Sequence, residues 1–402
     1  MKHLSKILIA SVIFGFVFSG LLNITFYIAG RNPYELFLIG LFILLTALSV
    51  KANDFTLNIS KIDYCFIIYF ISILFFPILF NNYEIVHHGG DLHVLFVSVK
   101  IYLVYRIIKE TLFLSNFKNS EKYIFDTIIF YSIVAGFIGV LRLLEIPGIT
   151  AQIDYIWPTE KYPYRMTSTM SGINGGAIFF SLVSIIAIHL YSKTSRNTYL
   201  FSIVLLSLFV ILTGSLTGII LLTAFYIYYF YKNFKFKIFV YTTLAVSISI
   251  VVLFNLFPLR AAIDVLYDER IERRVLAHSG QTILPRTLEF RYLRWDDQIR
   301  KGFEKPIFGH AVSTVNNQLP NYSITHNYYI YLFLYTGLTG LFVFLLFYFG
   351  MVYKLYHTKH KRYMLYILIF IFVAQGTQIT LNYGGISEML GVLIYLNKDI
   401  FK

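Results

Sequence analysis

The sequence predicts an all-α polytopic membrane protein with about 12 transmembrane helices and a large helical outer loop. Composition is the first indication, since 57% of the 402 residues are hydrophobic and only 14% are charged. Spacing is the second, because apolar runs of roughly 20 residues, enough to cross about 30 Å of hydrocarbon, recur from end to end. Backbone groups in lipid must bond within their own segment, so these runs are expected to be helices rather than strands.

Twelve apolar segments account for most of the chain, and together they predict a single integral membrane domain over residues 1–402. They span 7–29, 35–50, 62–80, 93–115, 123–144, 172–191, 198–212, 216–231, 238–257, 327–353, 363–381 and 386–397. The seventh, eighth and twelfth are short, so ten or eleven helices remain an alternative. The first segment starts with Lys2 and Lys6 like a signal peptide, but no small-residue cleavage site follows, and we interpret it as a retained helix.

Lysine and arginine are distributed unequally between the two sets of loops. With the N-terminus inside, the cytoplasmic stretches hold 19 positive residues, whereas the outer stretches other than the large loop hold four. Positive residues accumulate in cytoplasmic loops, so both termini are predicted inside. The smaller loop 145–170 and the large loop 258–325 are then outside, where long loops escape the rule.

The kind of cation also differs between the two sides. The cytoplasmic positions are 16 Lys and three Arg, and the outer positions, with the large loop included, are three Lys and 11 Arg. The planar guanidinium fork suits bidentate binding of phosphate, which favours a phosphate-bearing substrate outside. Alternatively, the arginines pair with acidic residues of the same loop in a solvated helical cap.

The large loop 258–325 contains two amphipathic patterns with a helical period, at 259–276 and 286–302. The apolar side of the second comprises Leu288, Tyr292, Trp295 and Ile299. Gly302 is predicted to end this helix, and residues 306–309 to turn the chain back toward the bilayer. Three arginines lie within about two turns of one another on this second predicted helix, and they could converge on one polyanionic group. They are Arg286, Arg291 and Arg294.

Short motifs surround the start of the helix that follows this loop. They are Arg291-x3-Trp295, Pro306-x-x-Gly309, His326-Asn327 and Gly337-x-x-Gly340. With the loop layout, they resemble the O-antigen polymerase and ligase superfamily of polytopic membrane enzymes, which act on undecaprenyl-pyrophosphate-linked glycans. The resemblance covers residues 165–353 well, whereas the first five helices match only in being hydrophobic.

The resemblance implies a GT-C-like glycosyltransferase architecture and a role for each motif residue. The implied catalytic residues are His326, as the base that activates the acceptor hydroxyl, and Arg291. The implied pyrophosphate-binding residues are Arg165, Arg286 and Arg294, and the implied supporting residues are Asn327, Gly309, Gly337 and Gly340. The chemistry agrees, because a neutral imidazole can accept a hydroxyl proton and arginines can stabilise a diphosphate leaving group without a metal. No metal and no cofactor are expected, and direct attack would invert the anomeric carbon.

The predicted function is an O-antigen or surface polysaccharide polymerase in the bacterial inner membrane, with its active site on the periplasmic face. The expected partners are lipid-linked oligosaccharide and membrane lipid, with a chain-length regulator and a flippase as further candidates and no nucleic acid. One alternative is an O-antigen ligase, although the outer turn 213–217 lacks the arginine that ligases tend to carry there. A flippase is a more distant alternative, and it would favour buried ionisable residues such as Lys100 and Asp126.

Several of these residues also have a simpler structural interpretation. His326 could cap its helix at the interface, Asn327 is expected to be a helix-start residue, and Gly337 and Gly340 are expected to permit close packing. The histidine cluster of the first outer loop could in principle hold a metal, but two of its members are adjacent, so a solvated loop is favoured. It comprises His87, His88, Asp91 and His93.

Overall fold

The structure is a computed structural model of the chain, and it describes about two thirds of the residues. The described residues are 2–18, 33–53, 56, 59–72, 89–115, 117, 119–144, 146, 166, 169, 173–233, 295–310, 327–358, 362–376 and 385–398. Over these ranges the chain forms helices and contains no strand. The all-α prediction is therefore confirmed for this part of the molecule.

Helices lie in eleven of the twelve segments predicted from apolar runs, and the remaining one, 238–257, falls outside the described residues. The helices are α1 (Lys2–Val17), α3 (Pro33–Ala52), α4 (Lys61–Phe70), α6 (Gly89–Ser115), α7 (Ser120–Leu143), α9 (Ile173–Thr194), α10 (Asn197–Leu212), α11 (Leu216–Asn233), α17 (Tyr328–Tyr356), α18 (Arg362–Gln375) and α19 (Ile386–Leu396). Four of these, α3, α7, α9 and α17, are long and apolar enough to cross a membrane. By this measure the described residues support four of the expected spans.

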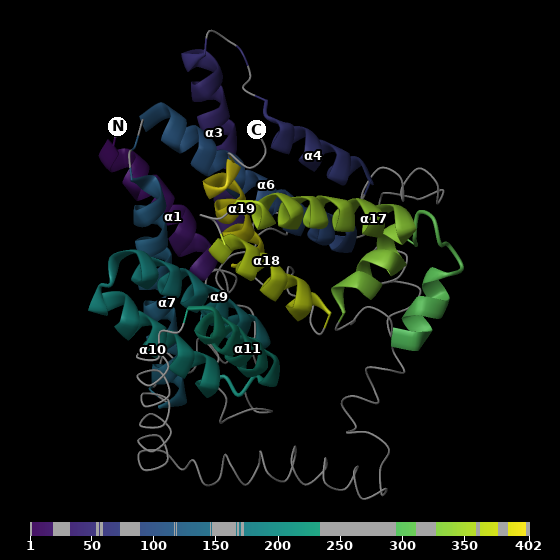
Figure 1. Ribbon diagram of the computed structural model, residues 1–402. Helices are drawn as coiled ribbons and strands as arrows, with labels where there is room; N and C mark the ends of the chain where they lie inside the picture. Colours follow the sequence, from purple (N-terminus) through teal and green to yellow (C-terminus); the bar gives the residue numbers. More distant parts are fainter. Residues whose placement is uncertain are drawn as a thin grey trace, which may run out of the picture.

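Helix α9 is the central element of the bundle, and α7, α10, α11 and α18 pack around it (Figure 1). Almost every residue from Gly175 to Leu190 is buried. A helix that is apolar on all sides must be covered by lipid or by other helices, and here other helices cover it. Near its N-terminal end small residues permit a close approach, since a Cβ added at Gly218 of α11 would lie 2.6 Å from the Cβ of Ala177.

Two buried groups of charged residues join helices on the other side of the bundle. Asp63 of α4 lies 3.2 Å from Arg106 and 3.3 Å from Lys109 of α6. Lys100, in the middle of α6, lies 3.3 Å from Glu388 of α19 and 4.0 Å from Glu35 of α3. Lys100 is thus paired, as buried charges must be to remain ionised in an apolar interior.

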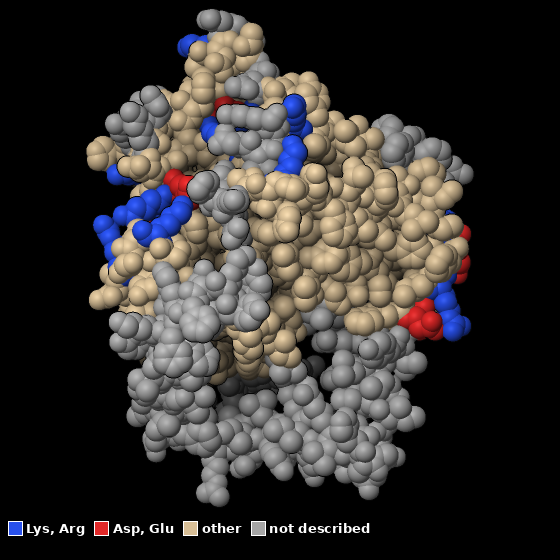
Figure 2. All heavy atoms as spheres, in the orientation of Figure 1, with Lys and Arg blue, Asp and Glu red and all other residues tan. Residues whose placement is uncertain are grey.

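Neutral side chains cover most of the described surface in the view of Figure 2, and charged ones gather toward its edges. Many of the large apolar side chains on this surface are exposed, including Phe201, Phe342 and Leu346 at 63%, 64% and 63%. A broad uncharged surface with exposed aromatic and aliphatic residues suits a hydrocarbon environment.

Candidate functional site

The start of α17 is fixed by Asn327, the residue that follows His326. Its side-chain oxygen accepts hydrogen bonds from the backbone N–H groups of Tyr329, at 3.0 Å, and Ile330, at 3.2 Å. Its amide nitrogen donates to the carbonyl of Gly376 at 3.1 Å, which ties this helix start to the end of α18. The expectation that Asn327 is a helix-start residue is confirmed. His326 itself lies outside the described residues.

Helix α17 is broken at Gly337, whose φ of 64° and ψ of −166° are not helical. An unbroken helix would join the N–H of Leu338 to the carbonyl of Leu334. Here the large loop supplies both partners, since the Leu338 N–H donates to Pro306 at 2.8 Å and the Leu334 carbonyl accepts from the His310 N–H at 2.9 Å. The loop segment 306–310 is therefore inserted into the hydrogen-bond pattern of the helix.

Two glycines make this insertion sterically possible. A Cβ added at Gly309 would lie 2.5 Å from the backbone of Thr336 and of Gly337, and a Cβ added at Gly337 would lie 2.6 Å from the N of Gly309. Both have positive φ, at 70° and 64°, where side chains are strained. Gly337 thus permits close packing, as expected, although its partner is the loop backbone rather than another helix. A Cβ at Gly340 would meet the side chain of Thr336 within α17.

The described end of the second loop helix, residues 295–302, packs against the N-terminal half of α17. A Cβ added at Gly302 would lie 2.5 Å from the ring of Phe333, and Phe303 makes an edge-on contact with that ring, with 5.2 Å between centroids. The helix ends at Gly302 as predicted. The loop helix and α17 therefore meet through aromatic packing as well as through the backbone.

The buried side of this loop helix coincides only in part with its predicted apolar side. Gln298 and Gly302 are buried and Trp295 is half-buried, whereas Ile299 is 37% exposed. Gly302 faces Phe333, so the side of the loop helix that contacts α17 carries Gln298 and Gly302, three and seven residues after Trp295. Ile299, which was predicted on the apolar side of this helix, lies outside that contact.

His310 is a site residue that the sequence interpretation missed. It is only 4% exposed, and its Nε2 donates to the carbonyl of Lys301 at 2.7 Å, at the end of the loop helix. Burial lowers the pKa of this imidazole, with the nearby Lys305 and Lys301 acting in the same direction. The hydrogen bond to Lys301 and the carboxylate of Glu304 oppose that change. Its position directly after Pro306-x-x-Gly309 is the one signal in the sequence that could have indicated it.

The described charges of the loop helix are paired locally. Arg300 lies 2.8 Å from Asp296, one turn earlier, and Lys301 pairs with Glu304. These charges lie at the lower right of Figure 2, over the loop helix drawn at that position in Figure 1. For Arg300, the interpretation as a partner of the loop's own acids is confirmed. His326 and the four arginines to which the sequence analysis gives catalytic or pyrophosphate-binding roles lie outside the described residues, and those roles stay predictions. These arginines are Arg165, Arg286, Arg291 and Arg294.

The residue after Arg165 is anchored at the end of α10. Met166 is fully buried, and its N–H donates to the carbonyl of Leu212 at 2.9 Å. In the turn between α10 and α11, Ser215 donates to the side-chain oxygen of Asn174 at 2.9 Å. Thr213 and Ser215 of this turn are buried, and the turn carries no charged residue, consistent with the missing arginine noted in the sequence.

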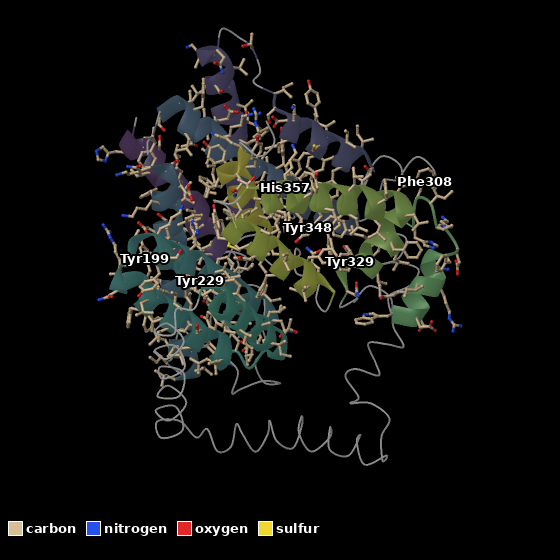
Figure 3. All side chains as sticks on the ribbon, in the orientation of Figure 1. Tyr199, Tyr229, Phe308, Tyr329, Tyr348 and His357 are labelled. Atoms are coloured by element: carbon tan, nitrogen blue, oxygen red, sulfur yellow. The ribbon has the colours of Figure 1, made fainter. Side chains whose placement is uncertain are left out.

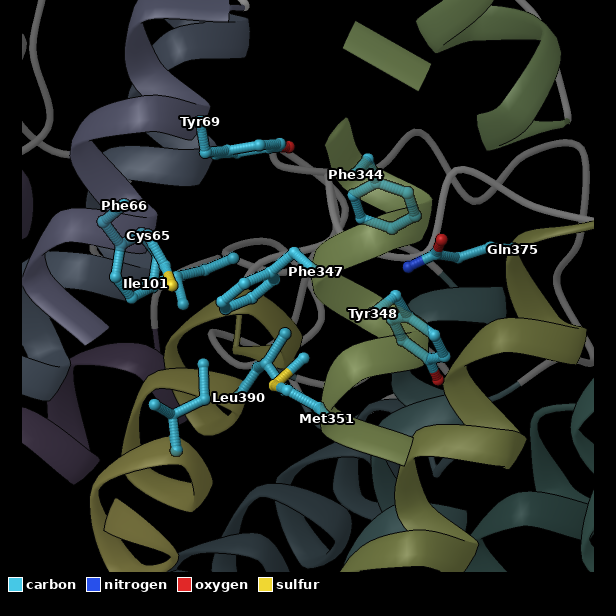
Figure 4. A pocket seen from close by; sticks show the side chains of 11 residues that line it. Cys65, Phe66, Tyr69, Ile101, Phe344, Phe347, Tyr348, Met351, Gln375 and Leu390 are labelled. Atoms are coloured by element: carbon cyan, nitrogen blue, oxygen red, sulfur yellow. The ribbon is translucent and has the colours of Figure 1, made fainter. Parts of the chain in front are cut away.

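A mainly apolar pocket lies between α4, α6, α17, α18 and α19 (Figure 4). Its walls include Tyr69, Phe344 and Tyr348, and one polar side chain, Gln375, points into it. The Gln375 amide is fully buried and has no hydrogen-bond partner among the described residues. Because Gln375 precedes Gly376, to which Asn327 is bonded, the pocket adjoins the start of α17. Figure 3 shows Tyr329 and Tyr348 in this region, between α17 and α18.

No group of three metal-ligating side chains occurs in the ranges that the structure describes. His87 and His88 fall outside these ranges, and the side chains of Asp91 and His93 are not described either.

The described residues define an all-helical protein with helices long and apolar enough to span a membrane. One of these helices, α17, starts at a capping asparagine and is broken at Gly337, where a segment of the charged loop bonds to its backbone. Residues 201–345 match the family model described as O-antigen ligase, so this part of the chain is similar to the O-antigen polymerase and ligase superfamily. The match runs from α10 to the first half of α17 and includes the loop insertion. It is consistent with a glycosyltransferase-like enzyme that acts on lipid-linked oligosaccharide. None of the curated proteins compared with the chain matches it.

Proposed function

We propose that the protein is an O-antigen or surface polysaccharide polymerase. It transfers a glycan from one undecaprenyl pyrophosphate carrier to the next lipid-linked repeat unit, at the outer face of the inner membrane. The observation that carries this proposal is the insertion of segment 306–310 into α17. It joins the arginine-bearing loop to the helix that starts directly after His326, within the segment that matches the family.

In the proposed mechanism, His326 accepts the proton of the acceptor hydroxyl as that oxygen attacks the anomeric carbon. The bond from this carbon to the pyrophosphate oxygen breaks, and the diphosphate carries away the electron pair. Arg291 stabilises the negative charge that develops on the leaving group, with Arg165, Arg286 and Arg294 binding the remaining phosphate oxygens. Attack from the side opposite the leaving group inverts the anomeric carbon, and no metal takes part.

The test is elongation of lipid-linked repeat units by the purified protein in detergent, followed by gel analysis of the glycan. His326→Ala and Arg291→Ala are expected to lower the rate at least about 100-fold, the size of effect expected from losing a general base or an electrostatic stabiliser. Arg300→Ala is the matched control, because this arginine lies on the same loop helix but is exposed and paired with Asp296. Long-chain product from the first two variants at the wild-type rate would refute the mechanism.

A ligase is the second candidate, and the description of the matching family favours it. The uncharged turn at 213–217 argues for the polymerase instead. Supplying the purified protein with lipid-linked repeats alone, or with lipid A core as acceptor, separates the two. A ladder from repeats alone indicates a polymerase, and transfer only to the core indicates a ligase. Either reaction in detergent, where no compartments exist, would exclude a flippase as the sole function.

A further inference from the structure

Helix α1 has two distinct faces along its whole length. One face is buried in the bundle through Ile9, Val12, Ile13 and Phe16, each at most 2% exposed. The opposite face follows a helical period of three and four residues. It comprises His3, Lys6, Ile7, Ala10, Ser11 and Phe14. This second face is cationic at its start and apolar at its far end.

The second face of α1 forms a groove together with α7, which lies beside it in Figure 1. Tyr123 of α7 donates to the backbone carbonyl of Lys6 at 3.0 Å, and Tyr131 contacts Phe14 with 5.6 Å between ring centroids. Eight residues separate the two positions on each helix, which corresponds to about 12 Å of helical rise. The two helices therefore run alongside one another and enclose a groove of about 430 Å³.

The two ends of the groove differ in chemistry. At one end, the Lys6 ammonium lies 5.6 Å and 5.7 Å from the ring centroids of Phe117 and Tyr123. No carboxylate lines the groove, and Lys6 makes no ion pair within the part of the chain that the structure describes. At the other end, Phe18 stacks on Phe14 at 4.5 Å and closes the aromatic wall.

We infer that this groove binds an anionic membrane phospholipid, with the headgroup phosphate at Lys6 and His3 and one acyl chain along Ile7, Ala10 and Phe14. Charge complementarity selects the headgroup, because the cationic end lacks an acidic partner in the groove. The two contacts between α1 and α7 lie about 12 Å apart along the helices, which is close to the thickness of one hydrocarbon leaflet, roughly half of 30 Å. With the N-terminus inside, as the charge distribution predicts, the lipid belongs to the cytoplasmic leaflet. The site is therefore separate from the proposed outer reaction centre.

The test is native mass spectrometry of the full-length protein in detergent, with phosphatidylglycerol or phosphatidylcholine added at equal concentration. The wild type is expected to retain phosphatidylglycerol in preference. Lys6→Gln is expected to weaken phosphatidylglycerol binding about fivefold, the contribution of one lysine at an anionic headgroup, and to remove the preference. Lys6→Gln keeps the hydrogen bond from Tyr123, which uses the backbone carbonyl. The matched control is Lys122→Gln, since Lys122 is an exposed lysine of α7 outside the groove, and its binding should equal that of the wild type.

A second variant tests the acyl-chain half of the groove. Ala10→Phe places a ring between the two helices and should lower the binding of both lipids, with the headgroup preference of any remaining binding retained. Three results would overturn the inference: equal binding of the two lipids by the wild type, wild-type binding by Lys6→Gln, or an equal loss in Lys6→Gln and Lys122→Gln. Thermal unfolding of each variant without added lipid provides the check on folding.

Discussion

Replacing Gly337 by alanine should separate the large loop from α17. The new Cβ would lie within van der Waals overlap of the Ile307 backbone and 2.6 Å from the N of Gly309. It would also have to adopt φ 64° and ψ −166°, a region that only glycine occupies readily. Both effects act on the same few atoms, because the loop carbonyls of Pro306 and Ile307 accept hydrogen bonds directly after this residue.

The expected cost combines two contributions. Backbone strain in this region costs about 1–3 kcal/mol, and insertion of a methyl group into a packed contact costs about 1–3 kcal/mol. The folded loop junction should therefore lose about 2–6 kcal/mol. A cost of this size is enough to release the loop locally, since local opening in proteins begins at free energies near zero and extends up to the global stability.

The assay is limited trypsin digestion in detergent together with thermal unfolding. Trypsin can cleave after Arg300 and Lys301, both within the docked segment, and their protection should be lost in Gly337→Ala. Gly350→Ala is the matched control, because Gly350 lies in the same helix and a Cβ there meets nothing within 4 Å. It should stabilise the helix by about 0.5–1 kcal/mol. If the two variants show equal protection and equal unfolding temperatures, the assigned role of the break is wrong.

Three further predictions concern side chains that join elements. Asn327→Ala should cost about 1–2 kcal/mol, since it removes the helix cap and the bond to Gly376, and an unchanged unfolding temperature would contradict this. Because the folded-state pKa of His310 lies below its ordinary value of 6.5, its contribution to stability is complete above pH 6.5 and is lost as pH falls toward the lowered pKa. Trypsin protection of the loop should fall over that range in the wild type but not in His310→Gln. Glu388→Gln should cost about 3–5 kcal/mol in thermal unfolding, because it leaves Lys100 buried without its nearer partner, and replacing both residues by methionine should restore most of the loss.

The positions of the helices could be predicted from the sequence because apolar length is a local property. Helix α9 was predicted at 172–191 and lies at Ile173–Thr194, and the end of the loop helix at Gly302 follows from one glycine. Asn327 was likewise interpreted correctly, since a helix cap depends only on the next three residues.

The long-range relations could not be predicted in the same way. The spacing Gly337-x-x-Gly340 is typical of helix packing, and nothing local indicates that its partner is the backbone of residues 306–310. The exposed position of Ile299 follows from the contact between Gly302 and Phe333, 31 residues apart in the chain, which no periodicity contains. The pairing of Lys100 with Glu388 has the same origin.

The insertion of segment 306–310 into α17 also restricts how this part of the molecule can move. Opening a hinge between the loop and α17 would leave the N–H of Leu338 and the carbonyl of Leu334 without partners, since the geometry at Gly337 keeps them from bonding each other. The segment is bonded to α17 on both sides of Gly337, so residues 306–310 and the adjoining turns of α17 move as one unit. Any rearrangement that admits a substrate must bend the chain outside this unit.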